Sequence, residues 1–113
     1  MGLSVLVVED DWLIGQDLKD RLEVAGCAVL GPAPNCSAAL EVLWRQRPDL
    51  AFVDTHLGSE TCEAVLDECD RQRIPVIISS GHDEQDLPPF ARGFRYLGKP
   101  YTAGTVEHVL RSA

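Results

Sequence analysis

The chain has 113 residues, which suits one folded domain and leaves no room for a second. Apolar residues make up 45% of it and charged residues 25%, the proportions of an ordinary globular protein. The net charge is −8 with dispersed acidic residues, so the basic surface that binds nucleic acid is not expected, and no apolar run is long enough to span a membrane.

Strand-like and helix-like patterns alternate through the first half of the chain. Residues 3–8 form a continuous Val-rich run, typical of a strand that is covered on both faces. Apolar residues then recur at three- and four-residue steps up to Gly26, which predicts an amphipathic helix. Residues 27–30 form a second short strand, which we expect to end at Gly31 and Pro32. The core stripe of the next predicted helix consists of Ala39, Leu40, Leu43 and Trp44.

The second half continues the alternation. Residues 50–53 predict a third strand, residues 75–79 a fourth and residues 94–98 a fifth. Between the last two strands, residues 83–92 contain two adjacent prolines, so any helix there is expected to be short or broken. The core face of the third helix is predicted to contain Cys62, Val65, Leu66 and Cys69, and that of the last helix Ala103, Val106, Val109 and Leu110.

Strands and helices in strict alternation predict a single α/β domain. A connection between parallel strands has to cross over one face of the sheet, so the expected fold is a parallel five-stranded sheet between two layers of helices. The four cysteines form no C-x-x-C pair and are best interpreted as small buried hydrophobic residues. The first residues carry no basic segment of the secretory type, so we expect a cytoplasmic protein with reduced thiols.

Polar residues collect where the predicted strands end. In an open parallel sheet, ligands bind beyond the carboxyl ends of the strands. The acidic residues 9–11 follow the first strand, Asp54 the third, Ser80 the fourth and Lys99 the fifth. We therefore expect acids, a hydroxyl and an amine to meet at one edge of the sheet.

This set of side chains favours magnesium and phosphoryl chemistry. Glu9, Asp10 and Asp54 would repel one another without a cation, and hard oxygen ligands in that number suit Mg²⁺. Asp11 is expected to cap the first helix instead. Lys99 can neutralise a phosphoryl oxygen. Phosphoryl transfer depends on positioning and charge neutralisation, so these side chains could support transfer to a carboxylate.

Four segments (residues 5–11, 50–54, 74–81 and 97–100) resemble, in order and spacing, the signature segments of the bacterial two-component response-regulator receiver (CheY-like) family. The resemblance implies a flavodoxin-like (βα)5 fold with strand order 2-1-3-4-5. Residues 31–33 and 54–58 and the shortened region around 87–89 are similar to short receivers associated with HWE-family histidine kinases.

The resemblance also assigns roles at the site. It makes Asp54 the phosphorylated residue, with Glu9, Asp10, Asp54 and the backbone carbonyl of His56 as the Mg²⁺ ligands. Ser80 and Lys99 would stabilise the phosphoryl group. Ser80 and Tyr96 would form the switch that responds to phosphorylation.

Two histidines carry a separate hypothesis. His56 and His82 lie two residues past Asp54 and Ser80, positions that flank the phosphoryl group in receivers. Their imidazoles would tune dephosphorylation by orienting or excluding the attacking water, and their charge would change between pH 5 and 8. The alternative is that both are exposed loop histidines.

The implied function is a signalling module spanning residues 1–113 without an output domain. A histidine kinase or phosphotransfer protein would donate the phosphoryl group, and the sequence does not identify the downstream partner. Nucleic acid and membrane are not expected partners. The alternatives are a pseudo-receiver that is not phosphorylated, an aspartyl-phosphate phosphatase and a flavodoxin-like cofactor binder. The phosphatase would need Asp-x-Asp after the first strand and a cap domain, and the cofactor binder a Gly/Ser/Thr-rich loop where residues 9–11 are acidic.

Overall fold

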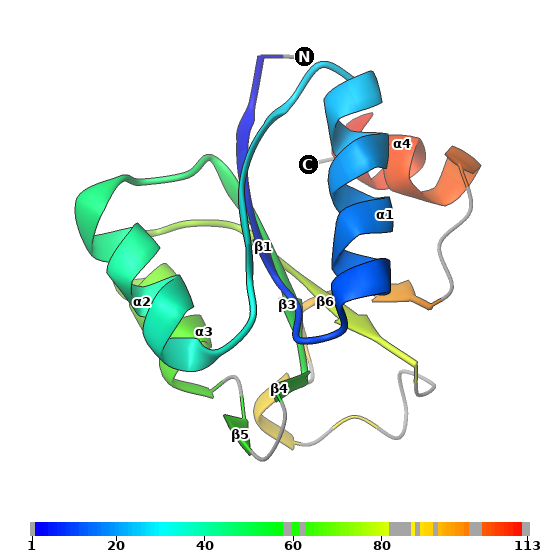
Figure 1. The fold of residues 1–113 in the computed structure, drawn as a ribbon. Helices are drawn as coiled ribbons and strands as arrows, with labels where there is room; N and C mark the ends of the chain where they lie inside the picture. Colours follow the sequence, from blue (N-terminus) through cyan, green and yellow to red (C-terminus); the bar gives the residue numbers. More distant parts are fainter. Residues whose placement is uncertain are drawn as a thin grey trace.

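A computed structural model describes residues 2–57, 60–61, 63–81, 87, 89–91, 93–99 and 103–111. Its main sheet contains five parallel strands in the order β2-β1-β3-β6-β7 (Figure 1). These strands are β1 (Ser4–Val8), β2 (Ala28–Ala33), β3 (Leu50–Asp54), β6 (Val76–Ser80) and β7 (Arg95–Gly98). The helices are α1 (Trp12–Val24), α2 (Cys36–Arg45), α3 (Glu63–Arg71) and α4 (Ala103–Arg111). This is the predicted (βα) sandwich with the predicted strand order.

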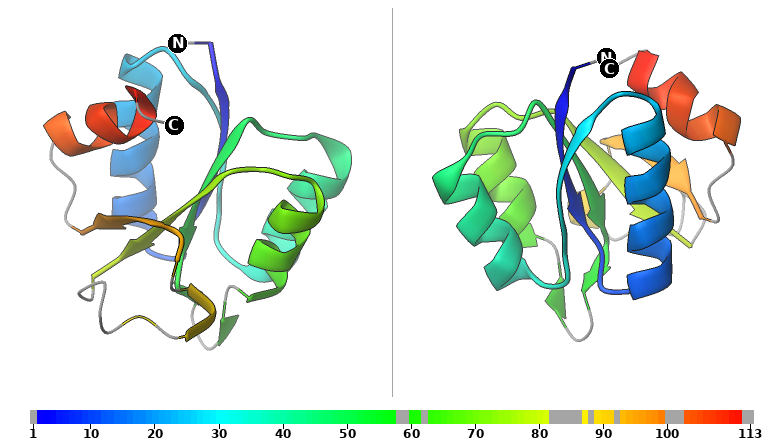
Figure 2. Two further views of the ribbon diagram at one scale, coloured as in Figure 1. Left: turned by 180° about the vertical axis from the view of Figure 1, so that it is seen from behind. Right: turned by 45° about the horizontal axis from the view of Figure 1, so that its top comes forward.

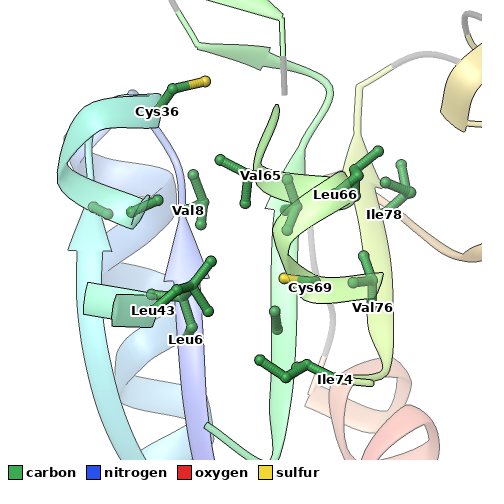
Figure 3. Packing of buried hydrophobic residues seen from close by; sticks show 14 of the residues in the cluster. Leu6, Val8, Cys36, Leu43, Val65, Leu66, Cys69, Ile74, Val76 and Ile78 are labelled. Atoms are coloured by element: carbon green, nitrogen blue, oxygen red, sulfur yellow. The ribbon is translucent and has the colours of Figure 1, made fainter. Parts of the chain in front are cut away.

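The sheet is covered on both faces. Helices α1 and α4 lie on one side and α2 and α3 on the other (Figures 1 and 2). Along β1, Val5 and Val7 pack toward α1 and α4, whereas Leu6 and Val8 pack toward α2 and α3 (Figure 3). Successive side chains of a strand point to opposite faces, so a strand buried on both faces needs a continuous apolar run.

Strand β2 is longer than expected. The prediction that it ends at Gly31 and Pro32 is wrong, because pairing continues to Ala33 after a register irregularity opposite β1. Proline is tolerated there because β2 is an edge strand. Gly31 has φ +104, and a Cβ on it would lie 2.7 Å from the carbonyl oxygen of Val7. The chain can therefore cross this closely over β1 only with glycine.

Helix α2 also corrects one expectation. Trp44 was expected in its core stripe but is 66% exposed. Ala39 and Leu43 are buried, while Leu40, one turn before Trp44, is only partly buried. Leu40 and Trp44 therefore lie at the margin of the stripe, where the indole has no core to enter.

The remaining expectations concern the region before β7 and the cysteines. The broken fourth helix is confirmed in the described part of residues 83–92, where Pro89–Ala91 form a 3₁₀ helix. Two short strands that were not expected, β4 (His56–Leu57) and β5 (Glu60–Thr61), pair as an antiparallel ribbon.

Cys27, Cys36 and Cys69 are buried free thiols, and Cys62 lies outside the described residues. Among the described helices, none is long and apolar enough to cross a membrane.

Candidate functional site

Three carboxylates meet at the carboxyl ends of two neighbouring strands. Glu9 and Asp10 follow β1, and Asp54 ends β3, which pairs with β1 in parallel register. Oxygen atoms of the three side chains lie within 4.8 Å of one another. Glu9 and Asp54 are buried, whereas Asp10 is exposed. The site therefore has a buried floor of two acids and a third acid that faces solvent.

Lys99 reaches this cluster from the far side of β6. Its Nζ lies 3.0 Å from Oδ2 of Asp54 and also forms an ion pair with Oε1 of Glu9. Its backbone N–H donates to the carbonyl oxygen of Ser80 at 2.9 Å, which fixes the residue at the end of β7. Burial alone would lower the pKa of Lys99, but the neighbouring carboxylates of Glu9 and Asp54 more than offset it, so the pKa is raised. The ammonium group remains charged.

Glu9 is held from several directions. Its N–H donates to the carbonyl oxygen of Ala33 at 2.9 Å, so the extension of β2 anchors its backbone. Its Oε2 accepts from the N–H of Asp11 at 3.2 Å. Burial, and then the hydrogen bond to Asp54, raise the pKa of Glu9 from 4.5 to about 7. Ionising the carboxyl group of Glu9 therefore costs free energy unless a cation lies close to it.

Asp11 serves the helix rather than the acid cluster. It is the N-cap of α1, and its Oδ1 accepts from the N–H of Ile14 at 3.1 Å. This confirms the expected capping role. Of the three consecutive acids, two lie in the cluster and the third starts the helix.

Ser80 is the last residue of β6 and directly follows Ser79, which lies opposite Asp54 in the sheet. It is 1% exposed, and its hydroxyl oxygen accepts from Oγ1 of Thr55 at 3.5 Å. The hydroxyl of Tyr96, which is half-buried on β7, donates to the carbonyl oxygen of Ser80 at 3.5 Å. The two predicted switch residues, Ser80 and Tyr96, are therefore in contact. Sequence reasoning missed Thr55, although its position directly after Asp54 places it beside the site.

The two histidines remain untested by the structure. His56 begins β4 shortly after Asp54, and His82 lies outside the described residues. The role of the His56 carbonyl in metal binding and the tuning of dephosphorylation by both histidines stay predictions.

The donor set fits a hard divalent cation. Three carboxylates converge, and Lys99 forms ion pairs with the two buried ones, Glu9 and Asp54. Oxygen-only sites with few protein ligands and open access suit Mg²⁺, which keeps several waters and shares phosphate oxygens. In such a site Glu9, Asp10 and Asp54 would hold the ion, whose charge would add to that of Lys99 in offsetting the repulsion between the carboxylates.

The comparisons with known proteins agree on one family for this chain. The sequence profile of the response regulator receiver domain matches residues 5–111. The chain is 30% identical over 122 residues to the phyllosphere-induced regulator PhyR of Methylorubrum extorquens, covering 100% of this chain and 44% of that protein. It is 29% identical over 102 residues to the transcriptional regulatory protein PdtaR of Mycobacterium tuberculosis, covering 87% and 50%. The chain thus spans about half the length of these curated relatives.

Solved structures agree with this. The signal receiver domain of a modulated diguanylate cyclase from Desulfovibrio desulfuricans has a TM-score of 0.84 and 28% identity, covering 100% of this chain and 94% of that one. The receiver domain of the sensor histidine kinase PA1611 from Pseudomonas aeruginosa, with a magnesium ion in its active-site cleft, has a TM-score of 0.84 at 21% identity, covering 99% and 97%. The latter likeness shows the shared fold.

Proposed function

Because this chain belongs to the response regulator receiver family, we propose that it accepts a phosphoryl group on Asp54 from a phosphohistidine of a histidine kinase or phosphotransfer protein. The observation that carries the proposal is the contact of Lys99 with Asp54 and Glu9, with Asp10 beside them. One carboxylate would be the acceptor and the other groups would neutralise charge. Phosphoryl transfer requires a positioned acceptor and neutralisation of the charge on the phosphoryl oxygens.

The transfer step balances without a further reactant. A carboxylate oxygen of Asp54 attacks phosphorus, the phosphorus–nitrogen bond of the donor breaks, and the imidazole leaves with a proton from solvent. Bound Mg²⁺ would supply charge neutralisation for the phosphoryl oxygens and the acids. Lys99, 3.0 Å from Asp54, would pair with a phosphoryl oxygen once the acceptor carboxylate has become an acyl phosphate.

The output would be a change in protein contacts rather than a released product. A phosphoryl group adds negative charge and strong acceptor oxygens beside Ser80. The Ser80 hydroxyl would turn toward the phosphoryl group. Tyr96, whose hydroxyl contacts the Ser80 carbonyl, would then change its orientation as the second switch residue. The surface around β7 and α4 would then change its partner preference. We propose a cytoplasmic signalling role for the domain, with protein partners only.

Intact-mass spectrometry after treatment with acetyl phosphate tests the acceptor. Wild type is expected to gain one phosphoryl group only when Mg²⁺ is present, and Asp54→Asn is expected to gain none. Asp67→Asn is the matched control, because Asp67 is an exposed acid on α3 away from the cluster. Equal labelling of Asp54→Asn would show that the acceptor is another residue. No labelling of wild type, alongside a receiver that does label, would favour the pseudo-receiver.

A further inference from the structure

The C-terminal ends of helices α2 and α3 carry a basic surface on a chain whose net charge is −8. The two helices lie side by side and end just before strands β3 and β6 begin, so this surface lies at the opposite end of the sheet from the acid cluster (Figures 1 and 2). Five exposed residues form it, including four of the ten Lys and Arg residues of the chain: Trp44, Arg45, Arg47, Arg71 and Arg73. We call these five residues the Arg–Trp surface.

Hydrogen bonds join the two helix ends. The side-chain amide of Gln72 donates to the carbonyl oxygen of Leu43 at 3.0 Å and to Oε2 of Glu68 at 2.7 Å. The guanidinium group of Arg47 donates to the carbonyl oxygens of Gln72 and Arg73, at 3.1 Å each. The segment that follows α2 is thus fixed beside the segment that follows α3.

Only part of the positive charge on this surface has a counter-ion. Arg45 and Arg71 each pair with a glutamate of their own helix, and cations are favourable at a helix C-terminus. Within the described part of the chain, Arg47 and Arg73 form no ion pair. Their two guanidinium charges are therefore available to an anionic partner.

Arg73 has an unusual backbone conformation for an arginine. Its φ is +59, in the left-handed region that follows many helices and favours glycine. A residue with a Cβ costs free energy in this region. Among the described residues, the Arg73 side chain has no hydrogen-bond or ion-pair partner to offset that cost. What arginine adds at this position is a positive charge at the surface.

Trp44 adds an apolar side chain whose position is fixed. Its exposed indole forms a hydrogen bond to the carboxylate of Glu68, which also accepts from the side chains of Arg71 and Gln72. A side chain that is already held in place loses little conformational entropy when a partner binds. Tryptophan and arginine are also the residues that most often dominate the binding energy of an interface.

We propose that the Arg–Trp surface binds an acidic segment of a partner protein, with carboxylates on Arg47 and Arg73 and an apolar side chain against Trp44. Carboxylates match guanidinium groups in charge and in geometry. A nucleic acid is a poorer fit, because Glu41 and Glu68 lie beside the arginines and the whole chain is acidic, so a long polyanion would be repelled. The inference goes beyond the proposed function, because the surface lies away from the phosphoryl acceptor.

Fluorescence anisotropy of a labelled synthetic peptide, in which aspartates flank one leucine, measures this binding without Mg²⁺ or acetyl phosphate. Arg73→Gly is expected to weaken binding about fivefold, the factor for an exposed ion pair of about 1 kcal/mol. The same variant is expected to have a higher melting temperature, because glycine suits the left-handed backbone. A merely structural role for Arg73 would not combine weaker binding with higher stability. Trp44→Ala is expected to weaken binding about tenfold.

Two controls separate this surface from general electrostatic attraction. Arg111→Gln removes a positive charge from an exposed position on α4, on the other face of the sheet, and is expected to change the affinity by less than about twofold. The same peptide with asparagines in place of its aspartates is expected to bind wild type at least about tenfold more weakly, because both carboxylate contacts are lost.

Several results would overturn the inference. These are failure of wild type to bind the acidic peptide, equal losses of affinity in Arg73→Gly and Arg111→Gln, or a lower melting temperature in Arg73→Gly. Tighter binding of oligothymidylate than of the acidic peptide would assign the surface to nucleic acid instead. Self-association of wild type that Arg73→Gly abolishes would assign it to a second copy of the chain. None of these measurements involves phosphoryl transfer, so this inference and the proposed function can fail separately.

Discussion

The buried acid Glu9 makes the stability of the metal-free protein depend on pH in an unusual direction. Its pKa is raised from 4.5 to about 7, mainly by burial. Between these two values the folded state binds a proton that the unfolded state has lost, so the free energy of unfolding falls as pH rises. Each pH unit is worth about 1.4 kcal/mol, so the loss from Glu9 between pH 4.5 and 7 is on the order of 3 kcal/mol.

Urea unfolding of wild type and Glu9→Gln between pH 4.5 and 8, without divalent cations, measures this loss. Titrating groups away from the cluster are common to both proteins, so the difference between the two curves reports the ionisation of Glu9 together with its coupling to Asp54 and Lys99. Wild type is expected to lose stability relative to Glu9→Gln as pH rises through this range. Adding Mg²⁺ at pH 8 is expected to recover stability in wild type more than in the variant, because binding to the folded state alone stabilises it. Parallel curves for the two proteins would refute the reasoning that burial holds Glu9 partly protonated.

Three further predictions follow from the contacts described. Lys99→Met removes the ammonium group that pairs with the buried carboxylates of Glu9 and Asp54. At pH 8 the free energy of unfolding should therefore fall by about 3 kcal/mol, and Mg²⁺ should raise the melting temperature more than in wild type. Equal Mg²⁺-induced shifts in melting temperature would contradict this. Asp11→Ala removes the N-cap of α1, so the free energy of unfolding measured in urea should fall by about 1 kcal/mol while the affinity for Mg²⁺ stays unchanged. A loss of Mg²⁺ affinity would instead place Asp11 in the cation site. Gly31→Ala should destabilise the protein more than Gly93→Ala. Both glycines have positive φ, but of the two only Gly31 has backbone atoms within 3 Å of the new Cβ. Equal losses of unfolding free energy would show that the close approach to Val7 does not matter.

The sheet, and the meeting of polar side chains at one of its edges, could be predicted from the sequence because both depend on simple rules. A strand covered on both faces needs a continuous apolar run, such as residues 5–8 of β1 and residues 50–53 of β3, so those strands could be recognised in the sequence. Parallel strands present their carboxyl ends at one edge, so the polar residue after each run was expected there. The structure brings Glu9, Asp54 and Lys99 into contact as that rule requires.

What was missed depends on tertiary position. Nothing within residues 27–33 reveals that β2 is an edge strand, and only at an edge can pairing continue past Pro32. The contact of Thr55 with Ser80 follows from the register between β3 and β6, which the separate strand sequences do not specify. The β4–β5 ribbon has two residues in each strand, too few for an alternating pattern to be recognised.

The place of Lys99 on the last strand has a consequence for how the chain folds. Its strand, β7, lies at the sheet edge, and β6 separates it from the acids on β1 and β3. If β1 and β3 pair first, Glu9 and Asp54 approach each other before the ammonium group arrives, and their repulsion raises the energy of that partly folded chain. A divalent cation present during refolding would take the place of the missing charge at that stage. We therefore expect the refolding rate, and not only the final stability, to rise with Mg²⁺ concentration.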